Sequence, residues 1–258
     1  MIVCDRVLVS DIDGTLLRAG RPTAGLETLR WMIDRDESGI RLVYATGRTM
    51  QSVLELVHDG TLPEPHAVAS LVGTEVWLPP WNQADTAYAS RITEHWNRDR
   101  LLETASVVDE LELQPEEFQS PYKLSFFVDS EEPVRELQRR LRETDLRCRT
   151  IYSCGRFLDL MPERAGKLAA VEFITARWDA RSAAVLAAGD SLNDRDMLVH
   201  PRFFGVIVAN ADDELSEAVT GPRLHEASLP FAAGVLEGAE VFDFWSHKGH
   251  PAPRQSSR

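Results

Sequence analysis

Two aspartates with one residue between them follow directly after a short apolar run near the start of the chain. The segment RVLVSDIDGTLL places Asp11 and Asp13 where a predicted buried strand ends, with a glycine and a threonine next. In an open parallel sheet, ligands bind beyond the carboxyl ends of the strands, so both carboxylates are expected at that edge. Paired carboxylates can act as a nucleophile and as a general acid–base. A polar turn, in which Asp and Gly are common, explains this segment equally well on its own.

Two further segments offer groups that bind anions. YATGR ends a second predicted strand with Thr46, Gly47 and Arg48. A hydroxyl and backbone N–H groups at such a turn bind anions, although a capped turn gives the same pattern. Lys167 in RAGKLAA lies at a predicted helix start, where the helix dipole disfavours a lysine that does not face an anion. The alternative for Lys167 is a solvated surface position.

The segment AAGDSLNDRDML places acidic side chains after another predicted apolar strand. Asp190 and Asp194 bracket a short loop that also contains Asn193. Carboxylate oxygens of this kind suit Mg²⁺, although an acidic first turn of a helix is the simpler interpretation of this segment alone. Taken together, the four segments supply a nucleophilic carboxylate, a proton-carrying carboxylate, an anion clamp and a metal site. These are the components of phosphoryl transfer.

The elements that must position these side chains alternate along the chain. Apolar runs of strand length are followed by segments with helical spacing, which indicates βαβ units and a parallel sheet. We predict strands within residues 6–10, 39–46, 66–77, 182–194 and 203–210, and helices within 21–37, 49–59, 166–178, 195–201, 212–220 and 230–245. The predicted fold is α/β, a doubly wound parallel-sheet (Rossmann-like) core formed by residues 1–79 and 160–258. The segment 246–258 has no apolar periodicity and is predicted to be disordered.

The middle of the chain has a different pattern. Residues 78–90 form a break rich in Pro, Asn and Gln, and a helix-like stretch around Trp96 and an acidic segment follow. A strand, a helix and two strands are then predicted at 123–129, 131–144, 146–153 and 156–162. We therefore predict an inserted α+β domain at residues 80–159, which would act as a cap that selects the substrate.

The composition restricts the partners. The 258 residues carry a net charge of −13, which argues against binding to nucleic acid or to anionic membranes. Cys4, Cys148 and Cys154 show no paired spacing, so a disulfide framework or a zinc site is not expected, and the seven histidines form no metal-ligand pattern. The sequence shows no signal-peptide pattern and no apolar run of membrane-spanning length. We expect a cytoplasmic monomer.

The segments DIDGT, ATGR, AGK and GDSLND occur in the order found in the haloacid dehalogenase superfamily of phosphatases. The long gap between the second and third resembles the branch with a large α/β cap. EHWNRD and GVIVANADDEL further resemble bacterial and plant sucrose-phosphate phosphatases. The resemblance implies Mg²⁺-dependent hydrolysis of a sugar phosphate, most specifically a disaccharide phosphate such as sucrose 6-phosphate. Mannosylfructose phosphate or another glycosyl-sugar phosphate is the alternative substrate.

The resemblance also implies roles for matched residues. Asp11 would attack phosphorus and form an aspartyl-phosphate, and Asp13 would protonate the leaving sugar oxygen and then activate water. Thr46 and Lys167 would hold the phosphoryl group. The implied metal set comprises Asp11, Asp13 (through its backbone carbonyl), Asp190 and Asp194, the last of which would ligate the ion or orient its ligands. Substrate-binding positions are expected at Gly47, Arg48, Gly73, Thr74, Glu75, Lys123, Asp159 and Asn193.

Three alternatives remain open from the sequence. Trp77, Trp81 and Trp96 could stack on a sugar, but each is more simply interpreted as a core residue. A phosphomutase or phosphotransferase would use the same core and would transfer the phosphoryl group a second time. A non-catalytic sugar-phosphate-binding module, appended to a sugar-phosphate synthase, would keep the fold without turnover. Such a glycosyltransferase is also the expected protein partner of the enzyme.

Overall fold

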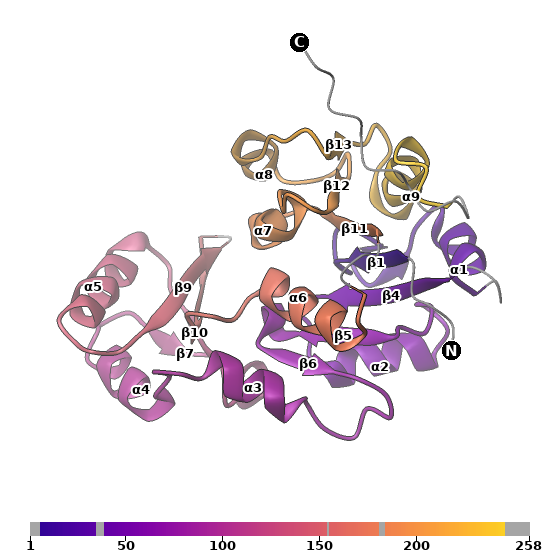
Figure 1. The fold of residues 1–258 in the computed structure, drawn as a ribbon. Helices are drawn as coiled ribbons and strands as arrows, with labels where there is room; N and C mark the ends of the chain where they lie inside the picture. The colour runs from indigo at the N-terminus through magenta and orange to yellow at the C-terminus, as the bar shows by residue number, and fades with distance from the viewer. Residues whose placement is uncertain (1–5, 35–38, 154, 181–183, 246–258) are drawn as a thin grey trace, which may run out of the picture.

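A computed structural model describes residues 6–34, 39–153, 155–180 and 184–245 (Figure 1). Cys4, Cys154 and the predicted disordered segment 246–258 lie outside the described residues. In the part of the chain that is described, no helix is both long enough and apolar enough to cross a bilayer.

A seven-stranded sheet forms the centre of the larger unit, in the order β13-β12-β11-β1-β4-β5-β6. Its strands are β1 (Arg6–Ser10), β4 (Ile40–Ala45), β5 (Ala67–Ser70), β6 (Glu75–Trp77), β11 (Ala184–Gly189), β12 (Phe204–Ile207) and β13 (Leu224–Glu226). All neighbouring pairs are parallel except β5 and β6, which are antiparallel. The central strand β1 is buried along its whole length, as expected for a parallel strand covered on both faces. The predicted parallel α/β sheet is thus confirmed.

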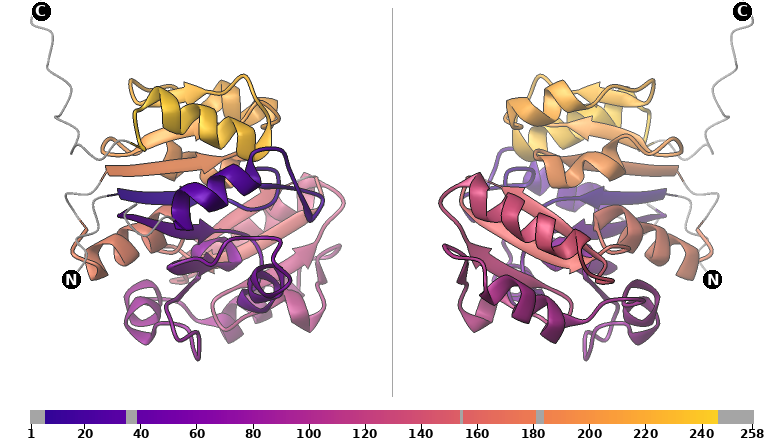
Figure 2. Two further views of the ribbon diagram at one scale, coloured as in Figure 1. Left: turned by 90° about the vertical axis from the view of Figure 1, so that its right-hand side faces the viewer. Right: turned by 90° about the vertical axis from the view of Figure 1, so that its left-hand side faces the viewer.

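Helices cover both faces of this sheet. One face packs against α1 (Leu26–Asp34), α2 (Met50–His58) and α9 (Phe231–Val241), and Figure 2 shows α1 and α9 together on that face. The other face packs against α3 (Thr86–Ile92), α6 (Lys167–Arg177), α7 (Arg195–Leu198) and α8 (Asp213–Ala218). Alternate residues of β1 serve the two faces, since Leu8 packs with the first set of helices and Val7 and Val9 with the second.

A smaller antiparallel sheet lies beside the larger unit (Figure 1). Its order is β7-β8-β10-β9, with β7 (Glu112–Leu113), β8 (Leu124–Phe127), β9 (Cys148–Ser153) and β10 (Phe157–Pro162). α4 (Arg98–Ser106) and α5 (Glu131–Arg142) pack on one face through a separate apolar cluster that includes Leu101, Phe126, Leu137 and Leu158. We call this unit the cap, and we call the larger unit the core.

The structure contains elements that the sequence did not predict. Asp85 caps α3 by accepting hydrogen bonds from the N–H groups of Ala87 and Tyr88, in a segment that we interpreted as a break. Tyr88 and Ile92 of α3 pack into the apolar cluster of the larger unit, although α3 falls within the predicted 80–159 insertion. β13 and the hairpin of β2 (Leu17–Arg18) and β3 (Arg21–Pro22) were also missed, because two or three residues carry no periodicity.

Candidate active site

The first aspartate pair lies in the turn that follows β1. Gly14 has φ +84°, and a Cβ atom there would lie 2.1 Å from Oδ2 of Asp190. Glycine is therefore required both for the turn and for the close approach of the loop after β11. Thr15 joins the same two loops, since its hydroxyl donates to Oδ1 of Asp190 at 2.7 Å. The turn thus places Asp11 beside the loop that carries Asp190.

Asp11, Asp190 and Asp194 form one carboxylate cluster. One oxygen from each lies within 4.8 Å of the others. Lys167, at the start of α6, extends into this cluster with its Nζ 3.1 Å from Oδ1 of Asp11 and 2.7 Å from Oδ1 of Asp194. The side chain of Lys167 is 1% exposed. Two of the three strand ends that the sequence singled out, those after β1 and β11, therefore meet the start of α6 at one buried site.

Asp194 holds the loop around Asp190 in place. It lies in η3 (Leu192–Asp194), and its Oδ2 accepts from the backbone N–H groups of Asp190 and Ser191 at 3.1 and 3.2 Å. Its Oδ1 accepts from Lys167. Gly189 leaves room for this fully buried carboxylate, because a Cβ there would lie 2.4 Å from it. Both oxygens of Asp194 are thus engaged within the protein, which suits a residue that orients other groups.

Burial shifts the pKa values of the cluster. Burial raises the pKa of the Asp11 carboxyl to about 8 against the opposing charge of Lys167, and Asp194 and Asp190 raise it further. Burial likewise raises the pKa of Asp190 to about 6 despite the hydrogen bond from Thr15. For Lys167, burial favours the neutral amine, but the charges of Asp11 and Asp194 outweigh it and raise the pKa.

The donor set fits a hard divalent cation. Among the described residues, the buried Oδ1 of Asp11 accepts no hydrogen bond of regular geometry, and the Lys167 ammonium lies 3.1 Å from it as an ion pair. Three carboxylates face one ammonium at this site in the described part of the chain, so the cluster has an excess of negative charge. A cation such as Mg²⁺, which binds one or two carboxylates together with water and phosphate, would supply the missing positive charge.

Asp13 and Arg48 face each other at the edge of the site. Nε and Nη2 of Arg48 donate to the two carboxylate oxygens of Asp13 at 2.6 and 2.7 Å, and Nη1 donates to Ser52. The Asp13 side chain is 49% exposed, and it is not one of the clustered carboxylates. Thr46 is buried, and its hydroxyl oxygen accepts from the N–H of Arg48. Gly47 is exposed between Thr46 and Arg48.

The predicted substrate residues of the cap form a separate polar pair. Nζ of Lys123 lies 3.3 Å from Oδ1 of Asp159, and the Ser125 hydroxyl donates to the same oxygen at 2.7 Å. On β10, the neighbours of Asp159 point into the apolar cluster of the cap, so Asp159 lies on the face turned away from α4 and α5. Lys123 and Asp159 are thus brought together, at a different place from the carboxylate cluster.

The segment after β5 has a structural role in this state of the protein. Gly73, at the end of η1 (Leu71–Gly73), has φ +78°, and a Cβ there would lie 2.4 Å from the Gly166 carbonyl. The Thr74 side chain is fully buried and donates to the Leu71 carbonyl. The structure therefore does not bring the Thr74 hydroxyl to an open site. Gly73 instead packs against the residue that precedes Lys167.

The remaining predicted positions are more peripheral. Glu75 accepts from the indole N–H of Trp77 at 3.1 Å, and Asn193 is exposed in η3. The three tryptophans are partly buried, at the margins of the apolar clusters rather than inside them. Trp77 and Trp81 pack against a cluster of the larger unit, and Trp96 packs against the cluster of the cap.

Asn210 is a residue of the site that the sequence did not single out. Its Nδ2 donates to the Gly14 carbonyl at 2.7 Å, and its Oδ1 accepts from the N–H of Phe231 at 2.8 Å. It thus ties the turn after β1 to the start of α9. The segment GVIVANADDEL was noted for its resemblance, but nothing in the segment itself indicated this contact.

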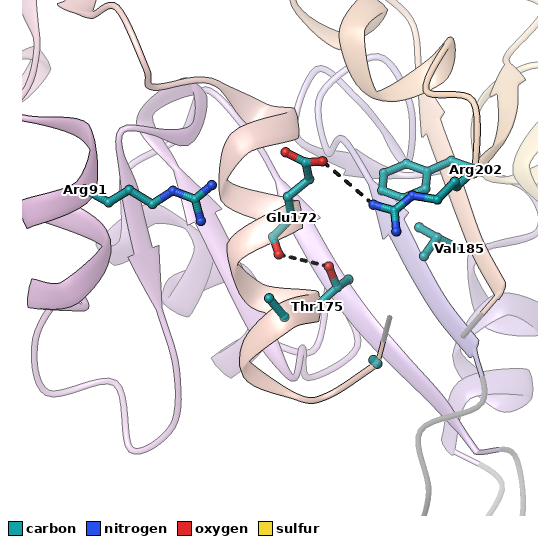
Figure 3. Close-up of a pocket in the computed structure, with 8 residues that line it drawn as sticks. Arg91, Glu172, Thr175, Val185 and Arg202 are labelled. Carbon is teal, nitrogen blue, oxygen red and sulfur yellow. Dashed lines mark hydrogen bonds and ion pairs between the residues drawn. The ribbon is translucent and has the colours of Figure 1, made fainter. Parts of the chain in front are cut away.

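A cavity of about 200 Å³ lies elsewhere in the larger unit, and Figure 3 shows residues that line it. It is lined by Arg91, Glu172, Thr175 and Arg202, among others. Val185, which also lines it, is near the amino end of β11, whereas Asp190 follows the carboxyl end of the same strand. The cavity is therefore at the opposite edge of the sheet from the carboxylates, and we assign it no part in the chemistry.

Comparison with known proteins identifies the family. A model of the family described as "Sucrose-6F-phosphate phosphohydrolase" matches residues 4–243. The chain belongs to this family. A solved structure of the sucrose-phosphatase from Synechocystis sp. PCC6803, in complex with sucrose and phosphate, is 30% identical with a TM-score of 0.82, and the match covers 93% of this chain and 98% of that one.

Two curated relatives of the sucrose-phosphate phosphohydrolase family differ in length from each other. "Sucrose-phosphatase 1" of Nicotiana tabacum is 31% identical over 92% of this chain, but this chain spans only 59% of the tobacco protein. "Mannosylfructose-phosphate phosphatase" of Agrobacterium fabrum is 28% identical over 90% of this chain and 95% of its own length. The chain thus corresponds to part of the first relative and to nearly all of the second.

Proposed function

We propose that the protein hydrolyses the phosphate monoester of a sugar phosphate through an aspartyl-phosphate intermediate. The observation that carries the proposal is the meeting of Asp11, Lys167, Asp190 and Asp194 at one buried site. A carboxylate nucleophile, an ammonium and a cation-binding pair of acids are what phosphoryl transfer from a dianion requires. Family membership supports the same activity.

In the first step, Asp11 attacks phosphorus and the sugar oxygen leaves. The Asp11 oxygen that lacks a hydrogen-bond donor is free to act as the nucleophile. Lys167 lies 3.1 Å from Asp11 and would stabilise the negative charge that develops on the phosphoryl oxygens. Asp13 would protonate the leaving oxygen, for which its bidentate contact with Arg48 must loosen. The bond from phosphorus to the sugar oxygen breaks as the bond to Asp11 forms.

In the second step, water attacks the aspartyl-phosphate and releases inorganic phosphate. Asp13, now ionised, would take the proton from this water. Thr46 and the N–H groups near Gly47 would hold the phosphoryl oxygens, and Asp194 keeps Lys167 in position through its 2.7 Å hydrogen bond. Mg²⁺, held by Asp11 and Asp190 with the Asp13 carbonyl, would neutralise charge on the transferred group.

We propose sucrose 6-phosphate as the substrate. The related Synechocystis protein is described in complex with sucrose and phosphate, and it matches this chain over nearly the full length of both. In this chain, Lys123 and Asp159 supply paired donors and acceptors that suit sugar hydroxyls. Glu75, Arg48 and Asn193 would add polar contacts between the phosphate site and the cap. Gly73 and Thr74 would act through the backbone that they shape.

Mannosylfructose phosphate is the second candidate. The observation that favours it is the relative from Agrobacterium fabrum, of whose length this chain covers 95%. Both compounds are glycosyl-fructose phosphates, and their difference in one sugar would be distinguished by the cap rather than by the carboxylate cluster.

The test is phosphate release from a panel of sugar phosphates with and without Mg²⁺. The panel holds sucrose 6-phosphate, mannosylfructose phosphate, glucosylglycerol phosphate, trehalose 6-phosphate and simple hexose phosphates. We expect the highest kcat/KM for sucrose 6-phosphate and loss of release upon chelation. A phosphorylated isomer in place of inorganic phosphate would instead indicate a mutase, and binding without turnover of any member would indicate a non-catalytic module.

We further propose that a glycosyltransferase supplies the substrate and that the protein itself is a monomer. Phosphorylated disaccharides are made by transfer of a glycosyl group to a sugar phosphate, so an adjacent synthase would shorten the path of its product. Size-exclusion chromatography with light scattering, alone and with that synthase, tests both statements. A dimeric mass for the isolated chain would contradict the first, and independent elution of the two proteins would contradict a stable association.

A further inference from the structure

The side chain of Arg149, in the cap, contacts two segments of the core. One segment precedes Lys167, and the other follows Asp194. Arg149 lies on β9, and its Nη2 forms an ion pair with Oδ2 of Asp196 on α7 at 3.0 Å. Its Nη1 donates to the Ala165 carbonyl at 3.4 Å. Ala165 is two residues before Lys167, and Asp196 is two residues after Asp194. A single guanidinium therefore joins the cap to both segments.

The fold explains why Arg149 points toward the core. On β9, Cys148 and Tyr152 pack against the apolar cluster of the cap, and the Thr150 hydroxyl accepts from Gln138 of α5. Arg149 and Ile151 alternate with these residues and so face the other way, and Ile151 packs against a cluster of the larger unit. The position of Arg149 is thus set by the register of the strand.

The chain before Lys167 accommodates the guanidinium. Gly166 has φ +147°, and a Cβ atom there would lie 2.9 Å from Nη1 of Arg149. A glycine at this position therefore allows Arg149 to lie against the backbone. Arginine can place separate N–H groups on a carbonyl and on a carboxylate, which the single ammonium of a lysine does less well.

Two other ion pairs near the boundary between the cap and the core do not reach α7 as Arg149 does. Arg164 pairs with Glu94, and Arg147 lies 3.9 Å from Glu163, so each of these pairs joins segments at the base of the cap. Neither pair includes a residue of α7. Arg147 lies on the same chain segment as Arg149 and is 63% exposed, which makes it a matched control.

We propose that Arg149 is a positioning residue that couples the seating of the cap on the core to the segments that hold Lys167 and Asp194. The Arg149 and Asp196 side chains are 42% and 43% exposed, so their contact is weak enough to break and reform. A cap that must admit a bulky sugar phosphate needs contacts with the core that can break and reform. The coupling itself is a property of the free protein, whereas its kinetic consequence rests on the proposed function.

The first test needs no substrate. Hydrogen–deuterium exchange of the full chain is compared for wild type, Arg149→Met and Arg147→Met. We expect Arg149→Met to raise exchange about fivefold in peptides covering residues 163–170 and 190–199, with no such rise for Arg147→Met. Wild-type exchange in Arg149→Met, or equal increases in both variants, would overturn the proposal. Circular dichroism and thermal unfolding of both variants are measured alongside, to establish that each is folded.

The second test is a double-mutant cycle in KM. Arg149→Met and Asp196→Asn are each expected to raise KM for the best sugar phosphate about fivefold, and the double variant to be no worse than either. The effect on p-nitrophenyl phosphate, which offers no sugar to the cap, is expected to stay below about twofold. Additive effects, or equal effects on both substrates, would contradict the coupling. If wild type hydrolyses no sugar phosphate, the proposed function fails, and the exchange measurement still decides the role of Arg149.

Discussion

The core and the cap each contain a lysine that faces aspartate, and the two sites differ in charge balance. In the core, the 1% exposed Lys167 faces both Asp11 and Asp194, with Asp190 nearby. In the cap, the 10% exposed Lys123 faces Asp159, which also accepts from a serine hydroxyl. The core site thus has more acids than bases, whereas the cap site is balanced.

Under the proposed function, this difference in charge balance would separate the site of the chemistry from the site of sugar recognition. An excess of buried carboxylates is costly unless a cation joins them, and under the proposed function a metal and a phosphate would complete the core site. The balanced pair of Lys123 and Asp159 needs no cation, and its donors and acceptors can form hydrogen bonds with neutral sugar hydroxyls. The same residue types would thus serve two purposes, according to their burial and local charge.

Removal of the nucleophile should have the largest effect. Asp11→Asn keeps the shape of the side chain but removes the attacking carboxylate, so kcat should fall on the order of 10⁴-fold or more. Phosphate release from the best sugar phosphate measures this. Since one carboxylate leaves the cluster, the variant should remain folded by circular dichroism. Turnover within about tenfold of wild type would show that another group attacks phosphorus.

The matched variants Lys167→Met and Lys123→Met test the comparison directly. Lys167→Met should lower kcat/KM about 10³-fold for every phosphate ester, including p-nitrophenyl phosphate, because it removes charge from the reacting centre. Lys123→Met should raise KM about tenfold for the sugar phosphate and leave p-nitrophenyl phosphate within about threefold. Equal losses on both esters for the two variants would remove the distinction between the sites.

The thermal stability of the protein should depend on Mg²⁺ and on pH together. Without a cation, the raised pKa values of Asp190 and Asp11, about 6 and about 8, contribute stability at low pH that is lost as the pH rises through these values. A cation requires the ionised carboxylates, so protons compete with it. We consider Mg²⁺ at one fixed concentration, a hundred times its Kd at pH 8. It should raise Tm by about 5 to 10 °C near pH 8 and by less near pH 5, where protons weaken its binding. A pH-independent shift in differential scanning calorimetry would contradict this account.

The smallest expected effect is on the stability of the loop around Ser228, which has no part in the proposed chemistry. The N–H of Ser228, followed by contacts from His225, the Ser228 hydroxyl and the N–H of Leu229, lowers the pKa of Glu237 to about 2. This stability is present above the usual pKa of glutamate and is lost as the pH falls toward 2. Glu237→Gln should cost about 1 kcal/mol at neutral pH and progressively less below about pH 4 in urea unfolding. An unchanged difference at both pH values would exclude this explanation.

The core site could be predicted because a regular element positions each residue. Asp11 and Asp190 follow parallel strands whose carboxyl ends share one edge, and Lys167 begins a helix beside them. The period of a strand and the start of a helix can be recognised in a sequence. Once the sheet is known to be parallel, they are enough to predict that these distant residues lie close together. The parallel sheet and the carboxylate cluster thus followed from local patterns.

The rest depends on tertiary contacts that have no local pattern. The salt bridge from Arg48 to Asp13 and the hydrogen bond from Asn210 to Gly14 join loops, and loop geometry is set by what packs around it. The burial of Thr74 could not be seen, because a threonine near a glycine is as compatible with a ligand as with a buried turn. α3 was missed because it has only seven residues and follows a stretch rich in Pro, Asn and Gln, so the two side chains that pack on the core show no helical period.

A crystal structure with Mn²⁺ in place of Mg²⁺ and with beryllofluoride, a mimic of a phosphoryl group, tests the central claim most directly. We expect beryllium bonded to the Asp11 carboxylate, fluorine atoms near Lys167, and an anomalous manganese peak beside Asp11 and Asp190. A manganese peak elsewhere, or beryllofluoride bonded to another side chain with Asp11 vacant, would contradict the claim that these residues form one phosphoryl-transfer centre.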